Sequence, residues 1–270
     1  GEYQLSLTVN GEHIHGSPFA TLVTPGTTCA GKSSVGGDGR LHAVAGEKTS
    51  LTIRAVDCYG NPATSGGDPF TASLVRGGMS SVASEVLDHR DGTYTAFYTP
   101  IVSGLWLLHV TMGGGGGGGG ENGGGPPVGS HAIGSPYSVV VMPGKTDARA
   151  SLAVGDGTSS AAIGEKTVVL VRTKDAKGND RAKGGDFVQA TLTQRSTHSV
   201  VHAKVKDTGD GSYSLSYVLT TSALPHDYML DVRVNNASIG GSPFRVRARP
   251  GPTVCEQTLS VQWPKCVAGA

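Results

Sequence analysis

The chain has 270 residues, and its 22 lysines and arginines nearly balance its 21 aspartates and glutamates. Such a charge balance provides no basic field of the kind on which nucleic-acid-binding proteins rely, so we exclude that class. The 42 glycines and 14 prolines indicate many turns, and alternating runs of Val, Leu, Thr and Tyr predict an all-β fold. The longest apolar runs, such as 139–142, are too short to insert into a membrane as a spanning helix.

Residues 1–25 contain the first of three related motifs. The tripeptide Gly-Ser-Pro followed by an aromatic residue occurs at 16–19, 134–137 and 241–244. The serines of successive copies are 118 and 107 residues apart. This spacing fits a small sandwich domain and is too long for a solenoid repeat. The sequence therefore predicts a tandem array of β domains.

Two further motifs recur in the same register. The segment AGEKT at 45–49 returns as IGEKT at 163–167, and an alternating run follows each copy, at 51–57 and 169–175. An Asp-Gly pair separates two alternating runs at 91–92 and again at 210–211, as in a tight hairpin. The neighbouring tyrosines alternate as core residues do, so we interpret them as packing residues. They are Tyr94, Tyr98, Tyr213 and Tyr217.

Taken in this order, the motifs resemble consecutive filamin-type immunoglobulin-like repeats. Residues 1–19 are similar to the last two strands of such a repeat, and the same pattern returns between His226 and Phe244. The resemblance implies an all-β fold of tandem immunoglobulin-like β-sandwiches, in a fragment of a longer repeat-containing protein. We expect the C-terminal strands of a partial repeat at 1–25, complete repeats at 26–144 and 145–250, and the start of a further repeat at 251–270.

One segment departs from the repeat pattern. Val9 and Ser17 are eight residues apart, as are Val234 and Ser242, but Val110 and Ser135 are 25 apart. A Gly-rich insertion at 113–129 therefore lengthens the final hairpin of the first complete repeat. Because the entropy of loop closure grows slowly with loop length, the insertion needs no role, and we interpret it as a spacer. A loop that contacts a partner is the alternative.

The resemblance also implies where a partner binds. Filamin-type repeats commonly accept a partner strand at the edge formed by their third and fourth strands. In the first complete repeat we expect these strands at 70–75 and 81–88. The residues expected to point inward are Phe70, Ala72 and Leu74 on the third strand and Val82, Ser84 and Val86 on the fourth. The outward residues, which form the candidate partner-binding site, are Thr71, Ser73, Val75, Ala83, Glu85 and Leu87.

The second complete repeat has a different outward set. It is polar and basic, and consists of Gln189, Thr191, Thr193, His202, Lys204 and Lys206. A partner strand with apolar side chains would prefer the first repeat. A spacer whose edges stay unoccupied is the alternative for either repeat.

One stretch matches a catalytic motif. Residues 26–33 (GTTCAGKS) satisfy the phosphate-binding pattern G-x-x-x-x-G-K-[ST]. That loop must enter a helix, because the helix N-terminus helps to hold the phosphates, and the Gly-rich segment at 35–40 cannot start one. We interpret the stretch as a linker between repeats and predict no nucleotide binding and no enzyme activity. His13 and His15 share one face of a strand without an evident third ligand, so we predict no metal, cofactor or catalytic residue.

The four cysteines are Cys29, Cys58, Cys255 and Cys266. They have neither the spacing of metal ligands nor that of the bridge between the two sheets of an antibody domain. Unpaired cysteines fit a reducing compartment. A bridge between Cys255 and Cys266, or a glycan at Asn236 in the Asn-Ala-Ser sequence, would instead indicate the cell exterior.

We therefore expect a non-enzymatic scaffold or spacer that mediates protein–protein interaction within a larger cytoskeletal or axonemal protein. Its partners would be cytoskeletal or axonemal proteins, or neighbouring domains, in the cytoplasm, cytoskeleton or cilium. Pro-Gly joints at 25–26, 143–144 and 250–251 would limit bending between repeats. The alternative is an extracellular adhesion module of a gamete or cell-surface protein.

Overall fold

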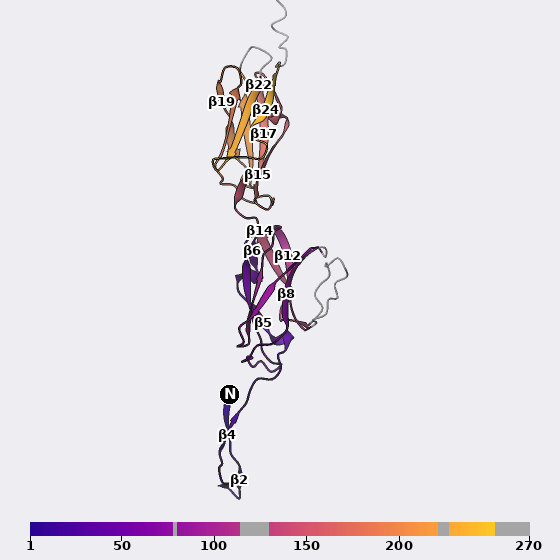
Figure 1. The fold of residues 1–270 in the computed structure, drawn as a ribbon, viewed down its shortest axis with the longest axis vertical. Helices are drawn as coiled ribbons and strands as arrows, with labels where there is room; N and C mark the ends of the chain where they lie inside the picture. Colours follow the sequence, from indigo (N-terminus) through magenta and orange to yellow (C-terminus); the bar gives the residue numbers. More distant parts are fainter. Residues whose placement is uncertain (78–79, 114–129, 221–226, 252–270) are drawn as a thin grey trace, which may run out of the picture. The chain divides into compact units, whose positions relative to one another are not determined.

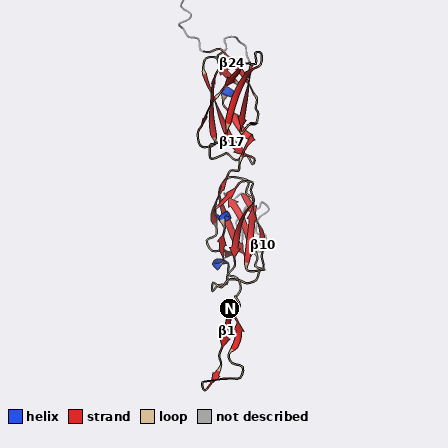
Figure 2. Cartoon of the chain, turned by 90° about the vertical axis from the view of Figure 1, so that its left-hand side faces the viewer, coloured by secondary structure: helices blue, strands red, loops and turns tan. Residues whose placement is uncertain are grey.

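The computed structural model describes residues 1–77, 80–113, 130–220 and 227–251, with only the backbone at 80 and 81. The chain divides into two units, Gly1–Met142 and Pro143–Ala270 (Figure 1). Strands make up nearly all of the regular structure in both units, as the predicted all-β class requires (Figure 2). The helical elements of the described residues are short 3₁₀ turns, η1 (Ala30–Lys32), η2 (Asp38–Arg40) and η3 (Asp156–Thr158).

The N-terminal residues form two small antiparallel pairs. Strand β1 (Glu2–Leu5) pairs with β4 (Phe19–Leu22), and β2 (Thr8–Val9) pairs with β3 (Glu12–His13). Every residue of these four strands is exposed.

The rest of the first unit is a sandwich of two sheets. One sheet has the order β10-β11-β7-β5, and the other has the order β6-β14-β12-β8-β9, with β13 paired to β12. The strands of the first sheet are β5 (Ser34–Gly36), β7 (Thr49–Arg54), β10 (Glu85–Asp88) and β11 (Thr93–Tyr98). Those of the second are β6 (His42–Val44), β8 (Phe70–Arg76), β9 (Ser80–Ala83), β12 (Gly104–Met112), β13 (Ser130–His131) and β14 (Tyr137–Met142).

The second unit repeats this topology. Its sheets have the orders β15-β17-β21-β20 and β16-β24-β22-β18-β19, with β23 paired to β22. The strands of the first sheet are β15 (Thr146–Val154), β17 (Lys166–Asp175), β20 (Lys204–Asp207) and β21 (Ser212–Val218). Those of the second are β16 (Ser160–Ala162), β18 (Val188–Gln194), β19 (Val200–His202), β22 (Asp227–Val234), β23 (Ala237–Ser238) and β24 (Phe244–Arg249).

Each sandwich has its own hydrophobic core between its two sheets. The four tyrosines interpreted as packing residues are all in these cores, and none is more than 4% exposed. The Tyr98 hydroxyl donates to the carbonyl of Gly39, and the Tyr217 hydroxyl donates to that of Gly157 at 2.5 Å. The aromatic rings thus fill the interior, and these two hydroxyls reach backbone acceptors, whereas the Tyr94 hydroxyl donates to the carboxylate of Asp68 at 2.8 Å.

The Gly-Ser-Pro motif has the same structure in all three copies. Its glycine has a positive φ, near 80°, and the peptide bond before its proline is cis. A Cβ at Gly241 would lie 3.1 Å from the ring of Phe244, so the site suits glycine in space as well as in φ. The motif ends the turn that leads into the last strand of each repeat.

Candidate partner-binding site

The third strand of the first complete repeat is β8, and its alternation is largely as predicted. Phe70, Ala72 and Leu74 are buried, whereas Thr71 is exposed. Ser73 is half-buried, and its hydroxyl has no hydrogen-bond partner within the described part of the chain.

Val75 does not follow the prediction. It was expected to be exposed, but it is only 8% exposed. The reason is that β8 is an internal strand, flanked by β12 and β9, and Val75 lies directly opposite Leu107 of β12. An outward side chain on an internal strand is covered by its neighbours when these are large.

The prediction of a single, continuous fourth strand over 81–88 is also wrong, because the structure has two strands there, β9 and β10. The chain crosses from one sheet to the other at Ser84, so β9 pairs with β8 and β10 pairs with β11. At the crossing, the N–H and the hydroxyl of Ser84 both donate to the carbonyl of Ala72, at 3.2 and 2.7 Å. The outward residues are therefore divided: Ala83 lies in the sheet of β8, and Glu85 and Leu87 lie in the other.

This crossing determines which backbone groups are open to a partner strand. Strand β9 lies along β8 from Ser73 to Arg76, so it occupies the edge of β8. Because hydrogen-bonded pairs alternate in an antiparallel ladder, the bond from Ser84 to Ala72 directs the backbone groups of Ser81 and Ala83 away from β8. Among the described strands, β9 is one of the two edge strands of this sheet, and β6 is the other.

The second complete repeat has the same crossing. Strand β19 pairs with β18 and β20 pairs with β21, and between them the N–H of Ala203 donates to the carbonyl of Ala190 at 3.0 Å. The side chains on the candidate edge are mostly available: Thr191 and Thr193 are half-buried, and the other four are exposed. Those four are Gln189, His202, Lys204 and Lys206.

A basic face lies beside this edge. Lys204 and Lys206 of β20 are opposite Ser216 and Ser214 of β21, and β17 follows on the other side of the serines. We call the four exposed cations on this outer surface the basic face; they are Lys166, Arg172, Lys204 and Lys206. Within the described ranges, none of them forms an ion pair.

A hollow of about 340 Å³ opens where β19 passes into β20. Lys166, His202 and Lys204 bring cationic or ionisable groups to it, and Val201 and Val218 add apolar surface. Positive groups around a partly apolar hollow favour an acidic ligand that also carries apolar atoms.

At the corresponding place in the first repeat, a carboxylate neutralises the positive charge of the lysine. Glu85 occupies the position of Lys204, and Phe97 that of Ser216, as the strand registers show. The Nζ atom of Lys48 lies 3.6 Å from the carboxylate of Glu85 and 4.2 Å from the centre of the Phe97 ring. The lysine at this position is therefore paired with a carboxylate in the first repeat, as Lys48, and unpaired among the described residues in the second, as Lys166.

The structure also shows a set of hydrogen bonds to a buried aspartate that the sequence did not indicate, and we call this set the polar joint. The buried carboxylate of Asp57 accepts the N–H of Gly26 at 3.0 Å and both the N–H and the side-chain amide of Asn61 at 2.8 Å. The hydrogen bond from the Asn61 side chain, followed by that from Gly26, lowers the pKa of Asp57 to about 2. The carboxylate thereby fixes the entry segment of the repeat to the turn after β7.

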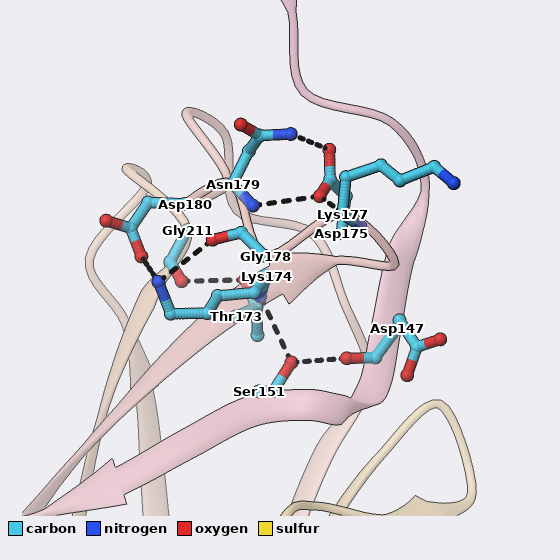
Figure 3. Close-up of polar contacts among 10 residues, drawn as sticks. All are labelled: Asp147, Ser151, Thr173, Lys174, Asp175, Lys177, Gly178, Asn179, Asp180 and Gly211. Atoms are coloured by element: carbon cyan, nitrogen blue, oxygen red, sulfur yellow. Dashed lines mark hydrogen bonds and ion pairs between the residues drawn. The ribbon is translucent and has the colours of Figure 1, made fainter. Parts of the chain in front are cut away.

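Asp175 makes the equivalent joint in the second repeat (Figure 3). It accepts the N–H of Gly144 and the side-chain amide of Asn179, both at 2.8 Å. Burial raises the pKa of Asp175, but these hydrogen bonds outweigh it, and the pKa is lowered on balance. The pattern Asp-x-x-Gly-Asn occurs at 57–61 and 175–179, so the repetition could have drawn attention to this joint.

The phosphate-motif stretch has no helix of the required length after it. It passes through the 3₁₀ turn η1, and Ser33 then begins extended chain. The buried hydroxyl of Ser33 donates to the carbonyl of Cys29 at 3.0 Å and accepts the N–H of Val56 at 3.2 Å. These bonds assign the hydroxyl to local structure.

One residue of the histidine pair, His13, has a local hydrogen-bond partner. Nδ1 of His13 lies 2.9 Å from the hydroxyl of Ser17. Within the residues that the structure describes, no three His, Cys, Asp or Glu side chains gather as metal ligands would. None of the helices in that part of the chain has the length and apolar character that crossing a bilayer requires. Most of the Gly-rich insertion (114–129), the start of the further repeat (252–270) and the Cys255–Cys266 pair lie outside the described residues.

The two sandwiches, with their shared topology and motifs, define a tandem immunoglobulin-like protein. The family model of the filamin/ABP280 repeat matches residues 27–138 and 145–245, and the chain belongs to this family.

Three comparisons show the range of similar proteins. The chain is 28% identical over 265 residues to filamin-C of Rattus norvegicus, which is 97% of this chain and 8% of filamin-C. It is 31% identical over 110 residues to the E3 ubiquitin-protein ligase TRIM71 of Bos taurus, which is 41% of this chain and 11% of TRIM71. Among solved structures it is similar to the Escherichia coli adhesin FdeC, with a TM-score of 0.54, 21% identity, and coverage of 92% of this chain and 74% of that one. The chain thus spans a small part of these curated relatives, and the likeness to FdeC shows the fold alone.

Proposed function

We propose that this chain is a non-enzymatic scaffold segment of a larger cytoskeletal protein, and that its repeats bind protein partners by strand addition beside the fourth strand. Similarity to filamin-C across 97% of the chain supports the cytoskeletal setting. In this proposal 26–144 and 145–250 are the complete repeats, 1–25 ends a preceding repeat, and 251–270 begins another.

The unpaired cations of the basic face carry the partner-binding part of the proposal. The bond between the N–H of Thr208 and the carbonyl of Ser212, at 3.1 Å, sets the ladder so that Val205 and Asp207 direct their backbone groups away from β21. A strand added there would place alternate side chains next to Lys204 and Lys206. Acidic side chains at those positions would satisfy both lysines, so the second repeat is the site for an acidic partner.

The first repeat suits a different partner. Its exposed Leu87 and its Lys48–Glu85 pair leave no excess positive charge beside β10. A strand with apolar side chains fits this edge, where Glu85 and Leu87 lie on β10; the other proposed partner-binding residues, Thr71 and Ser73 of β8 and Ala83 of β9, lie in the facing sheet. Val75 is not part of the exposed surface in this proposal, because it is buried.

A peptide titration tests the acidic site. An extended peptide with Glu at every second position should bind the full chain, with affinity that falls as salt concentration rises. The double variant Lys204→Glu and Lys206→Glu should weaken binding by about tenfold or more, whereas Lys177→Glu, which changes an exposed charge outside the basic face, should not. Methylating the backbone nitrogens of the peptide should also abolish binding, because strand addition uses those N–H groups. Binding that survives methylation would reject strand addition.

An extracellular adhesion module is the second candidate. The fold that the chain shares with FdeC occurs in an adhesin, although this likeness concerns the fold alone. A glycan at Asn236 in protein from its natural source would favour this candidate, since Asn236 is exposed in the turn between β22 and β23. An unmodified Asn236 together with co-purifying cytoskeletal proteins would favour the first.

A further inference from the structure

Two cysteines that are distant in the sequence meet at the entry of the first sandwich. Thr28 pairs with Asp57 in an antiparallel bridge, and the N–H of Cys29 donates to the carbonyl of Val56 at 2.8 Å. The hydroxyl of Ser33 links the same two segments, since it bonds to the carbonyl of Cys29 and the N–H of Val56. These bonds hold the backbone of Cys29 against the segment that leads to Cys58.

The bridge between Thr28 and Asp57 makes Cys29 and Cys58, the residues that follow them, neighbours across the two segments. The N–H of Gly60 donates to the carbonyl of Asp57 at 3.1 Å and closes the turn that contains Cys58. The Cys29 side chain beside it, together with burial and the nearby Asp57 charge, raises the pKa of Cys58. Both cysteines are free, Cys29 is half-buried, and Cys58 is exposed to solvent.

The second repeat shows that this backbone does not require cysteines. Asp147 occupies the position of Cys29, and Ala176 that of Cys58. The hydroxyl of Ser151 still donates to the carbonyl of Asp147 at 2.7 Å and accepts the N–H of Lys174 at 3.1 Å (Figure 3). The paired thiols are therefore an addition to a joint that forms without them.

We propose that Cys29 and Cys58 are a redox modification site that closes reversibly to a disulfide. The oxidant is a small external disulfide such as oxidised glutathione. The Cys58 thiolate attacks one of its sulfur atoms, forms a mixed disulfide and releases one glutathione thiolate. The Cys29 thiolate then attacks the Cys58 sulfur and displaces the second. The two cysteines lose two protons to solvent and two electrons to the glutathione disulfide, whose two thiolates take up two protons from solvent and become thiols.

The disulfide would fasten the entry of the first repeat. Cys29 lies between the joint at Gly26 and strand β5, and Cys58 lies just after Asp57, to which the N–H of Gly26 is bonded. Closing the loop between them restricts the unfolded chain and so stabilises the folded unit. Reduction would leave the hydrogen bonds of Asp57 and Ser33 as the attachment. This site is independent of the proposed function.

Thiol mapping of the full chain tests the site. In the variant Cys255→Ser with Cys266→Ser, equilibration with excess oxidised glutathione should lower the intact mass by about 2 Da and yield a peptide linking Cys29 to Cys58. The first unit should then melt several degrees higher than its reduced form, and added reductant should reverse both changes. The reaction should speed up with rising pH, because the thiolate is the attacking group.

Single variants separate the disulfide from a structural role of the side chains. Cys29→Ser and Cys58→Ser, each in the same background, should keep the melting temperature of the reduced parent and show no increase on oxidation. A parent chain in which both thiols remain open to alkylation would overturn the proposal. So would a chain in which Cys58 keeps glutathione without closing onto Cys29.

Discussion

At the residue scale, the serine accepts the same kind of backbone hydrogen bond in all three copies of the Gly-Ser-Pro motif. Its hydroxyl accepts the N–H of a residue in or next to the preceding strand: Leu7, just before β2, for Ser17 at 2.8 Å, Val110 for Ser135 at 2.9 Å, and Val232 for Ser242 at 2.9 Å. The hydroxyl thus satisfies a backbone donor where the ladder is interrupted. The recurrence of serine follows from this bond.

Replacing Ser242 with alanine should destabilise the second unit. The N–H of Val232, a buried residue, would lose its acceptor, which costs about 1–3 kcal/mol. Urea unfolding of the full chain measures the loss. Ser214→Ala, which changes a half-buried serine of the same unit whose hydroxyl has no hydrogen bond within the described residues, is the control and should have little effect. Equal losses for the two variants would contradict the assigned role.

The acid sensitivity of the first unit should depend on Asp57. Its pKa is about 2 in the folded chain, against an ordinary value of 3.8, so the unfolded chain takes up the proton first as the pH falls. The stability contributed by Asp57 is therefore complete above about pH 4 and is lost as the pH falls from 3.8 towards 2. Urea midpoints between pH 2 and 5 should show a shallower decline in Asp57→Asn than in the parent chain.

Asp38→Asn provides the matched control for this measurement. Asp38 is exposed, and no hydrogen bond to its carboxylate is seen in the described structure. The decline with pH should be unchanged in this variant. If Asp57→Asn declined as steeply as the parent, the hydrogen bonds to Asp57 would not be a source of acid sensitivity.

The sequence contained part of this residue-scale information. The pattern Asp-x-x-Gly-Asn recurs with the spacing of the domains. The role of Asp57 as a hydrogen-bond acceptor, however, depends on Gly26, which lies 31 residues before it. The meeting of Cys29 with Cys58 was hidden for the same reason. Contacts across such separations arise from the fold and leave no local periodic pattern.

At the element scale, the fourth strand shows where alternation stops being informative. Val82 and Val86 pack against the core on either side of the crossing, so the inward pattern continues from β9 to β10 without a break. A period of two is the same whichever sheet the strand pairs with. The alternation therefore predicted the facing of these residues correctly but could not show the change of sheet. It also placed Val75 on the outward side of β8, but it could not show that residues of the neighbouring strands cover this side chain.

The crossing at Ser84 makes a testable prediction. Ser84→Pro removes the N–H that donates to Ala72, so it should weaken the attachment of β9 and cost about 3 kcal/mol. Ser84→Ala should cost less than about 1 kcal/mol, because it removes only the hydroxyl bond and Ala203 occupies this position in the second repeat. Hydrogen exchange at residues 82–83 would rise in the proline variant. Similar behaviour of the two variants would show that the backbone bond is unimportant.

At the scale of the whole molecule, the repeat spacing was sufficient to predict the tandem arrangement. The three serine positions indicated modules of sandwich size, and the structure has two units with separate cores. The sequence could not show how the shared topology would acquire different surfaces. Lys48 and Lys166 occupy the same position of the repeated Gly-Glu-Lys-Thr motif. Of the two, only Lys48 has an acidic partner in the described part of the chain, because Glu85 in the first repeat corresponds to Lys204 in the second.

Separate cores imply that each unit has its own stability. Leu74 is completely buried in the first core and Leu192 in the second, at equivalent positions on β8 and β18. Truncating either leucine to alanine should cost about 3 kcal/mol in the unit that contains it, through lost burial and a cavity. Hydrogen exchange of the full chain, resolved by peptide, reports both units in one sample. Leu74→Ala should raise exchange in the first sandwich and leave the second unchanged, and Leu192→Ala should do the reverse. If either variant loosened both sandwiches, the two units would not have independent stabilities.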